Sequence, residues 1–364
     1  MNGNHGYSLI IASYNEGVFL KQTVDNILKT AHYPFFEIII IDDGSKDGSY
    51  LFLLEDAYKQ MPITLIRVSH RGIDAVRNIA AARTKYDTFI FVDAHMLFSN
   101  GWLKSVNKLF VRYPSLSLLG LSCKNIFGKR IKKTNYFHVY TPLNITLEQN
   151  IFLNIKKSEQ ELIKVPIING SNLIIKREVF EEMGGFWEID ANWQDNFFSI
   201  VAYYLGIDAY LAPHITVYHQ LKQSNDHILP GERFHLDKSL LACFLLYPKE
   251  VFEDCLSNFK EKFPQFFSSK TYKEFLKKKK YFIKLRDALE KHQKRTYAQF
   301  INEHYQYLPA FQLYDYTKGE RLIFKDNKKA KEYLQKSQNI TYLGTDKKTA
   351  LFKKNVKSLL RLVS

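Results

Sequence analysis

Asp93 and His95 are separated by one residue and follow the apolar run Phe89–Val92. Side chains two positions apart in an extended chain point to the same side, so this carboxylate and this imidazole can reach one ion. Such a pair suits Mn²⁺ or Zn²⁺ better than Mg²⁺ or Ca²⁺, which prefer oxygen ligands alone. In the alternative interpretation, Asp93 caps a following helix and His95 is a surface residue. A second predicted strand ends in His219, which could supply a third ligand, so we expect a metal site.

Asp42 and Asp43 place two carboxylates at the end of the apolar run Phe36–Ile41. Carboxylates in that position can accept hydrogen bonds from the ribose and the base of a nucleotide. The sequence contains neither G-x-G-x-x-G nor G-x-x-x-x-G-K-[ST], so the phosphates need another source of positive charge. Arg71, Arg77 and the metal are the candidates, because a diphosphate leaving group must be stabilised as its bond breaks. Alternatively, the two arginines lie on a solvated helix face.

Small polar residues precede the predicted strand that ends at Ile175. Such residues let a hydroxylated ring approach the backbone, which favours a sugar pocket. The residues concerned are Asn169, Gly170 and Ser171. Trp193, further along, either stacks on a sugar ring or fills core.

Apolar runs and helical patterns alternate through the first part of the chain. This spacing is typical of βαβ units on a parallel sheet, so we predict an α/β fold with a mostly parallel sheet and helices on both faces. Ligands of such sheets bind beyond the carboxyl ends of the strands, where the polar residues above occur. The predicted strands are Tyr7–Ala12, Phe36–Ile41, Ile63–Val68 and Phe89–Val92, and the predicted helices are Gly17–Ala31, Ser49–Lys59 and Gly72–Thr84.

The later part of the chain predicts a change of architecture. We assign no role to residues 124–165. The pattern becomes regular again at Ile167–Ile175. It then predicts a helix at Lys176–Met183, a helix from Trp193 through Leu205 and a strand at His214–His219. From about residue 232 the pattern is helical and rich in Lys, Tyr and Phe. We therefore predict a first domain at residues 1–232 and a mainly helical domain at residues 233–364.

Composition limits the class of protein. The chain has 364 residues, 46% of them hydrophobic and 24% charged, which excludes disordered, collagen-like and coiled-coil proteins. Three cysteines are too few for a disulfide framework and indicate a reducing compartment. The longest apolar run near the middle, Leu240–Tyr247, is too short to cross a membrane, and the N-terminus lacks the basic start of a signal peptide. We expect a cytoplasmic protein.

The positive charge is concentrated at the C-terminal end. Residues 270–364 contain 24 of the 52 Lys and Arg residues and 9 of the 37 Asp and Glu residues, so the remainder of the chain is neutral. This distribution argues against a nucleic-acid binder and for a local anionic contact. Residues 347–364 predict a basic amphipathic helix. That helix either lies on the inner face of a membrane as a peripheral contact or docks its apolar stripe on the protein itself.

Four motifs, in this order, resemble the family 2 glycosyltransferases of the GT-A fold, over roughly residues 7–220. They are Ser13-Tyr14-Asn15-Glu16, Asp42-Asp43-Gly44-Ser45 with Asp47, the stretch RGIDAVRN from Arg71 to Asn78, and a strand ending in an aspartate motif. The resemblance implies a GT-A domain that binds a nucleotide-sugar donor, most often UDP-linked, through the first two motifs. It implies nucleotide contacts for Ser13, Tyr14 and Glu16, and a metal that bridges the diphosphate.

The metal motif Asp93-Ala94-His95 is similar to that of the polypeptide N-acetylgalactosaminyltransferases, which carry D-x-H and a later histidine. The segment from Gly184 to His219 parallels their pattern, with Gln194-Asp195 where those enzymes have Gly-Glu, and this match makes His219 the third ligand. The resemblance implies that Asp195 is the general base of an inverting enzyme or a donor-sugar contact of a retaining one. Trp193 and Asn196 would then face the sugar or the acceptor. A plain helix-start carboxylate is the alternative for Asp195.

The sequence therefore predicts a glycosyltransferase that uses Mn²⁺ or another divalent cation. It would move a hexose or N-acetylhexosamine from a UDP-sugar to a hydroxyl of a peptide, glycan or cell-envelope polymer. One alternative is a catalytically inactive module that binds sugars or polyanions. The other is a nucleotidyltransferase, which needs a Gly-rich basic loop after the first strand that Ser13–Gly17 lacks.

Overall fold

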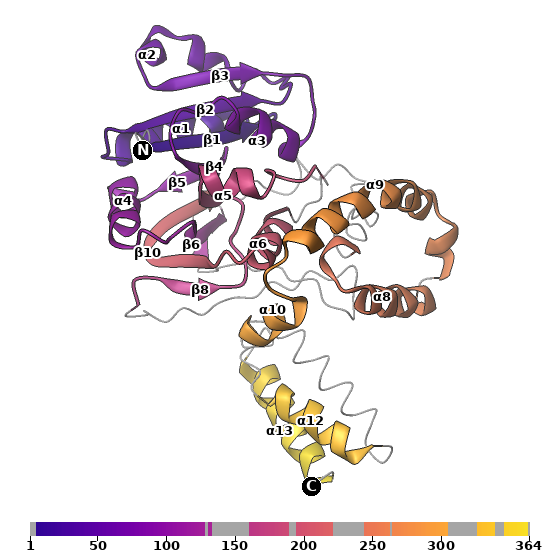
Figure 1. Ribbon diagram of the computed structural model, residues 1–364. Coiled ribbons are helices and arrows are strands. Elements are labelled where there is room, and N and C mark those ends of the chain that lie inside the picture. The colour runs from indigo at the N-terminus through magenta and orange to yellow at the C-terminus, as the bar shows by residue number, and fades with distance from the viewer. Residues whose placement is uncertain are drawn as a thin grey trace.

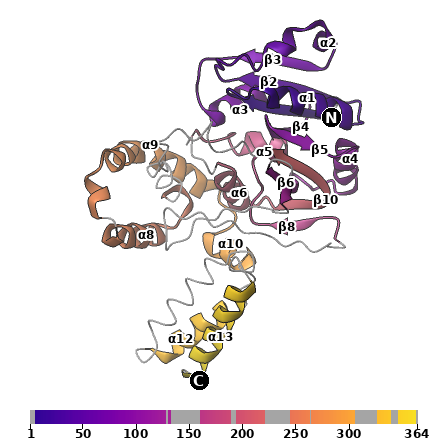
Figure 2. The ribbon, with the colours of Figure 1, turned by 180° about the vertical axis from the view of Figure 1, so that it is seen from behind.

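The computed structural model describes residues 5–127, 130–132, 160–188, 194–220, 244–262, 264–304, 326–338 and 346–362. A ten-stranded sheet forms one end of the molecule, and helices of the C-terminal part extend from it (Figures 1 and 2). The sheet path runs β3-β2-β1-β4-β9-β6-β10-β5, with β7 paired to β6 and β8 paired to β10.

The first four long strands pair in parallel, as predicted. In three of these strands nearly all Ile, Leu, Phe and Val residues are buried, because helices cover both faces of the sheet. The residues of the edge strand Ile63–Arg67 are only partly buried or exposed. The strands are β1 (Tyr7–Ser13), β2 (Phe36–Asp42), β3 (Ile63–Arg67) and β4 (Thr88–Asp93). The helices between them include α1 (Val18–Thr30) and α3 (Ile73–Ala81).

The second half of the sheet is mixed, which corrects the expectation of a mostly parallel sheet. β9 (Asn172–Lys176) runs antiparallel to both β4 and β6 (Leu118–Phe127). β10 (Ala209–Gln220) is parallel to β6 but antiparallel to β5 (Met96–Phe98) and to β8 (Ile163–Val165). An apolar run carries no information on strand direction, so periodicity alone could not reveal these reversals. β7 (Arg130–Lys132) completes the sheet.

Several predicted element bounds were wrong for local reasons. β10 starts at Ala209 rather than at His214 because the strand continues through Pro213 by means of a register shift between Ala212 and Thr216. The predicted helix over 49–59 divides at the extended residue Glu55 into η1 (Leu51–Leu54) and α2 (Asp56–Lys59). By contrast, the strand predicted to follow Asn169, Gly170 and Ser171 is β9, which begins at Asn172.

The two faces of the sheet have separate cores. One contains Leu9, Ile11 and residues of α1 and of α4 (Trp102–Arg112). The other contains Ile10, Phe91 and residues of α3, of α5 (Arg177–Glu182) and of α6 (Gln194–Tyr204). The alternation of neighbouring strand residues between the two cores is the period-two pattern of a strand covered on both faces.

The helices after residue 243 confirm the predicted helical character of this part of the chain. Their buried aromatic residues Phe275, Phe282 and Phe300 join the core that contains α6. The helices are α8 (Lys249–Lys262), η2 (Pro264–Ser268), α9 (Lys270–His292) and α10 (Tyr297–His304). The predicted domain boundary at residue 232 lies outside the described residues, as does most of the unassigned segment 124–165.

The last two helices, α12 (Asn327–Ser337) and α13 (Asp346–Leu362), lie side by side (Figures 1 and 2). Val356 of α13 is fully buried. Leu359 and Leu360 pack against a small cluster of Ala330 and Leu334 on α12. The apolar stripe of the predicted amphipathic helix therefore contacts the protein itself. No helix among the described residues combines the length and apolar character needed to span a membrane.

Candidate functional site

The register of the parallel strands aligns the polar residues that follow them. Ser13 at the end of β1 pairs with Asp42 of β2, and Ala12 of β1 pairs with Asp93 of β4. The carboxyl ends of three neighbouring strands therefore meet at one edge of the sheet. This is the edge at which open α/β sheets bind ligands.

His219 reaches the same edge through a long-range strand pairing. The antiparallel register of β10 and β5 sets His219 opposite Met96, the residue after His95. The backbone N–H of Gln220 donates to the His95 carbonyl over 2.9 Å, which fixes the end of β10 beside the Asp93-Ala94-His95 turn. Sheet pairing thus brings together residues more than 120 positions apart.

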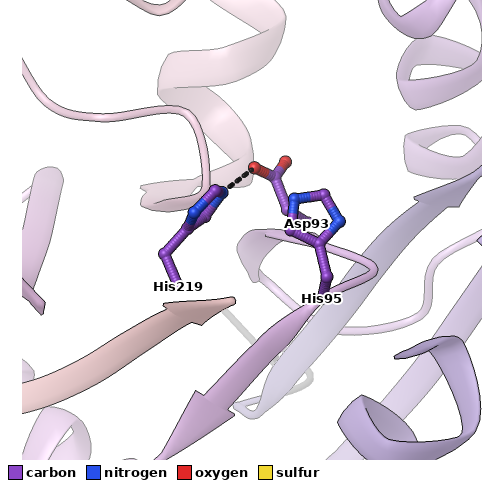
Figure 3. Close-up of side chains that lie close together, drawn as sticks. All are labelled: Asp93, His95 and His219. Carbon is purple, nitrogen blue, oxygen red and sulfur yellow. Dashed lines mark ion pairs between the residues drawn. The ribbon is translucent and has the colours of Figure 1, made fainter. Parts of the chain in front are cut away.

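The three predicted ligands form what we call the metal cluster: Asp93, His95 and His219 (Figure 3). One ligand atom from each residue lies within 4.8 Å of the others. Nε2 of His219 is 3.4 Å from Oδ2 of Asp93, and the two imidazole centroids are 4.7 Å apart. The three side chains are 17–23% exposed, so the cluster is accessible to a ligand while largely enclosed.

The donor set of the metal cluster fits a divalent cation of borderline hardness. One carboxylate and two imidazoles match Mn²⁺ or Zn²⁺ better than the all-oxygen shells that Mg²⁺ and Ca²⁺ prefer. Nδ1 of His219 is buried and has no hydrogen-bond partner in the part of the chain that the structure describes. Three protein ligands also leave coordination positions for oxygens of a substrate.

Both simpler interpretations of the Asp93-His95 pair are wrong. Asp93 is followed by a turn and then by the strand β5, so it caps no helix. His95 is 18% exposed and lies against Glu16 and His219, so it is no ordinary surface residue.

Arg77 lies beneath Asp93 rather than on a solvated face. Its side chain is 4% exposed, and its guanidinium donates to Oδ1 of Asp93 over 3.1 Å and to the Gly170 carbonyl over 3.3 Å. Burial alone would raise the pKa of Asp93. The hydrogen bond from His219 and the electrostatic interactions with His95 and Arg77 outweigh burial and hold that pKa below its usual range. Asp93 is therefore ionised at neutral pH, as a cation ligand must be.

Helix α1 holds the turn that carries the metal cluster. The Thr23 hydroxyl donates to the Ala94 carbonyl over 3.0 Å and accepts from the Met96 N–H over 2.9 Å. Asn26 accepts from the Phe98 N–H. Thr23 was not predicted as a site residue, although a threonine within the apolar stripe of α1 is a signal that its hydroxyl has a buried partner.

Glu16 contacts the metal cluster from the loop after β1. Its Oε2 lies 3.1 Å from Nδ1 of His95, and the glutamate is 8% exposed. Glu16 was predicted as a nucleotide contact, and the sequence motif does not indicate that its carboxylate lies near the imidazole of His95.

The paired carboxylates after β2 already accept hydrogen bonds from the chain. Asp42 is fully buried, accepts from Nε of Arg67 over 3.0 Å and is 3.3 Å from the Ser45 amide nitrogen, which donates to it. Asp43 accepts from the backbone N–H groups of Arg71 and Gly72 over 2.7 and 3.1 Å. These carboxylates fix the loops around the predicted nucleotide site.

Three other predicted nucleotide residues differ in exposure. The Tyr14 side chain is exposed, and its ring centroid is 4.6 Å from that of His70. Ser13 is buried, and its hydroxyl has no partner among the described residues. Arg71 is exposed, which agrees with the alternative of a solvated side chain.

The predicted sugar-contacting turn lies directly beside Asp93. The Asp93 N–H donates to the Ser171 carbonyl, and Arg77 links Asp93 to Gly170. The Asn169 side chain accepts from the Ser171 N–H and holds the turn. Trp193 lies outside the described residues. Asp195 and Asn196 lie in the first turn of α6, and the structure does not describe their side chains.

Asn78, the last residue of the RGIDAVRN motif, holds the Gly-Gly-Phe turn after α5, a role that was not predicted from the sequence. Its side chain donates to the Phe186 carbonyl over 2.7 Å and accepts from the Phe186 N–H over 2.9 Å. Gly185 has a φ of 76°, and a Cβ there would lie 2.8 Å from Oδ1 of Asn78. Only glycine fits that position without displacing Asn78.

Comparison with known proteins agrees with this geometry. Residues 8–184 match the family model described as "Glycosyl transferase family 2". This match covers the motifs after β1, β2 and β4, whereas His219 lies beyond its end.

Two curated relatives extend the comparison. An uncharacterized glycosyltransferase, YfnE of Bacillus subtilis, is 29% identical over 168 residues, which are 46% of this chain and 41% of the relative. Polypeptide N-acetylgalactosaminyltransferase 3 of Drosophila melanogaster is 24% identical over 241 residues, which are 62% of this chain and 36% of the relative. The chain thus spans less than half the length of each.

A solved structure supports the fold. The crystal structure of GalNAc-T7 with UDP, GalNAc and Mn²⁺ superposes with a TM-score of 0.64 at 18% identity, covering 82% of this chain and 57% of that chain. The predicted GT-A fold is therefore confirmed.

Proposed function

From the premise that residues 8–184 are a family 2 glycosyltransferase domain, we propose that this protein transfers a sugar from a nucleotide diphosphate to an acceptor hydroxyl. The observation that carries the proposal is the convergence of three ligand atoms, from Asp93, His95 and His219, within 4.8 Å of one another. The cluster lies at the sheet edge where the loops after β1 and β2 also begin. A donor bound to those loops would place its diphosphate near the metal cluster.

The metal cluster would hold Mn²⁺ or another divalent cation. Such a cation offsets the negative charge of the diphosphate as it leaves the sugar. Arg77 keeps Asp93 oriented from below and contributes a buried positive charge near the same carboxylate. This arrangement leaves the outward-facing side of the cluster for the donor.

We assign the nucleotide to the loops that contain Ser13, Tyr14, Asp42, Asp43 and Arg71. Tyr14 supports this assignment through its exposed ring beside His70. The two aspartates act mainly by fixing the loops, because Asp42 is buried and Asp43 already binds the backbone at the start of α3. An ionised carboxylate has about four lone-pair positions, so Asp43 retains the capacity to accept a ribose hydroxyl.

The sugar would lie between the 169–171 turn and the start of α6. Support comes from Asn169, Gly170 and Ser171, which are tied to Asp93. The roles of Asp195, as general base or donor-sugar contact, and of Trp193 and Asn196 stay predictions.

We propose a UDP-sugar as the donor and Mn²⁺ as the cation. The names of the polypeptide N-acetylgalactosaminyltransferase relative and of the UDP- and Mn²⁺-bound GalNAc-T7 structure support this choice. The acceptor would be a hydroxyl of a peptide, glycan or cell-envelope polymer.

A cytoplasmic location and a peripheral membrane contact also stay predictions. For that contact α13 offers exposed Lys353, Lys354 and Lys357, because its apolar residues pack on α12. Sedimentation with anionic vesicles at low and high salt tests it.

The proposed function is tested by the release of UDP from UDP-Glc, UDP-GlcNAc, UDP-Gal and UDP-GalNAc, with Mn²⁺ or with a chelator. The wild type should release UDP from at least one donor only when the cation is present. Asp93→Ala should abolish this release without loss of the fold, because it removes the cluster's only carboxylate ligand. His214→Ala is the matched control, since His214 is exposed on the same strand as His219.

Two outcomes would contradict the proposal. Undiminished release in chelator, or by Asp93→Ala, would refute the metal role. Binding of UDP without release from any donor would favour the inactive binding module.

A further inference from the structure

One carboxylate outside the metal cluster is aimed at it. Oε2 of Glu16 is 3.1 Å from Nδ1 of His95, and both side chains are mostly buried. Among the described residues, His219 has no equivalent support, since its buried Nδ1 lacks a hydrogen-bond partner. The two imidazoles of the cluster are therefore held in different ways.

The contact with Glu16 determines which nitrogen of His95 is available. An ionised carboxylate only accepts hydrogen bonds, so the Glu16 contact requires the proton on Nδ1 of a neutral His95. Nε2 then carries the lone pair that can bind a cation. Histidine ligands of metals generally donate their second ring N–H to such an acceptor, which orients the ring and strengthens the ligand.

The backbone on either side of Glu16 is fixed by hydrogen bonds between loops. The Asn15 N–H donates to the Ser45 hydroxyl over 2.9 Å, and the Gly17 N–H donates to Oδ2 of Asp47 over 2.8 Å. The Glu16 carbonyl accepts from the Phe19 N–H at the start of α1. Glu16 is thus presented to His95 from a rigid position, as a supporting carboxylate must be.

We propose that Glu16 is the positioning residue of the metal site, which holds His95 with Nε2 directed toward the cation. This role differs from the nucleotide contact that the sequence motif implied for Glu16. It rests on the proposed function, because it requires that the cluster binds a divalent cation.

The test is a titration of the full-length protein with Mn²⁺ at saturating UDP, followed by electron paramagnetic resonance of the free ion. Glu16→Gln should weaken Mn²⁺ binding by about 10-fold or more, because the amide is a weaker acceptor for the imidazole N–H. Glu37→Gln is the matched control. Glu37 is also 8% exposed and accepts from the Ser8 hydroxyl and the Lys85 N–H, but it lies on β2 away from the cluster. Its Mn²⁺ affinity should equal that of the wild type.

A second titration separates positioning from nucleotide contact. At saturating Mn²⁺, Glu16→Gln should bind UDP with wild-type affinity, because excess cation compensates for a weakened ligand. A loss of UDP affinity under that condition would make Glu16 a nucleotide contact and overturn the proposal. Unchanged Mn²⁺ affinity in Glu16→Gln, with normal binding by the wild type, would overturn it as well. Failure of the wild type itself to bind Mn²⁺ would instead refute the metal site, and the positioning role of Glu16 would then be refuted as well.

Discussion

Two clusters of ionisable side chains in this protein differ in how their side chains are arranged. In the metal cluster, the ligand atoms of Asp93, His95 and His219 converge to within 4.8 Å. A second group, which we call the docking cluster, consists of Lys164, Asp208, Arg295, Glu303 and His304, from β8, the start of β10 and the region of α10. Nζ of Lys164 lies 2.9 Å from both Asp208 and Glu303, and Arg295 pairs with Asp208.

Asp93 of the metal cluster is also paired with a cationic side chain, Arg77, so the difference lies in whether every polar atom has a partner. Each carboxylate of the docking cluster is paired with a cationic side chain, and Glu303 also accepts from the Tyr203 hydroxyl. The docking cluster therefore joins the C-terminal helices to the sheet and needs no ligand. In the metal cluster the side chains face one another around a common point, and one imidazole nitrogen is buried without a partner among the described residues. Convergence of ligand atoms, rather than residue type, distinguishes a binding site from a structural ion-pair network.

The largest expected effect is the loss of activity on removing a histidine from the metal cluster. Removal of the histidine of the docking cluster is the comparison. His219→Ala should reduce kcat/KM for the best donor by about 10³-fold or more, because loss of a ligand removes several kcal/mol of leaving-group stabilisation. His304→Phe should retain near wild-type transfer, since His304 packs against the rings of Tyr203 and Phe300 and its replacement is aromatic. Steady-state kinetics with Mn²⁺ measures both. Equal losses in the two variants would abolish the functional distinction between the clusters.

A smaller effect is the change in the free energy of unfolding with pH. Burial, together with the positive charge of Lys164, lowers the pKa of His304 from 6.5 to about 4. The unfolded chain therefore binds a proton between pH 6.5 and 4 that the folded chain does not, so the free energy of unfolding falls as the pH falls through this window. His304 alone should account for a loss of about 3 kcal/mol.

Urea denaturation at several pH values measures this dependence. His304→Phe should flatten the curve between pH 6.5 and 4, although the carboxylates of the docking cluster still lose their ion pairs at lower pH. A curve as steep as that of the wild type would show that His304 is not the responsible group.

The smallest effect is expected from Asp208→Asn. Arg295 and Lys164 outweigh burial and lower the pKa of Asp208, which shows that its charge is stabilised in the folded state. Because the carboxylate is partly exposed, its neutralisation should cost about 1 to 2 kcal/mol of stability. Thermal unfolding measures the cost, and Mn²⁺ affinity should not change. Weaker Mn²⁺ binding in Asp208→Asn would link the clusters and count against their separate roles.

Local patterns in the sequence were sufficient to predict one half of the site. The runs before Ser13, Asp42 and Asp93 are apolar on both faces, which predicts buried strands. Their alternation with helical patterns predicts that these strands run parallel, and this aligns the residues that follow them. Because of that alignment, we expected a ligand to bind at the edge of the sheet where these residues lie.

The other half depends on contacts that no local pattern contains. His219 joins Asp93 only because β10 pairs antiparallel with β5, and strand direction is not encoded in an apolar run. Arg77 was predicted to neutralise phosphate, yet it lies beneath Asp93, because its burial is set by the packing of α3 on the sheet. The link from Glu16 to His95 spans two loops and likewise emerges only from the tertiary structure.

The central claim is tested most directly by locating the cation itself. Crystals grown with UDP and MnCl₂ should be measured at a wavelength where manganese scatters anomalously. The account predicts an anomalous peak within coordinating distance of Asp93, His95 and His219. A cation bound elsewhere, with these three side chains making no contact to it, would contradict the account.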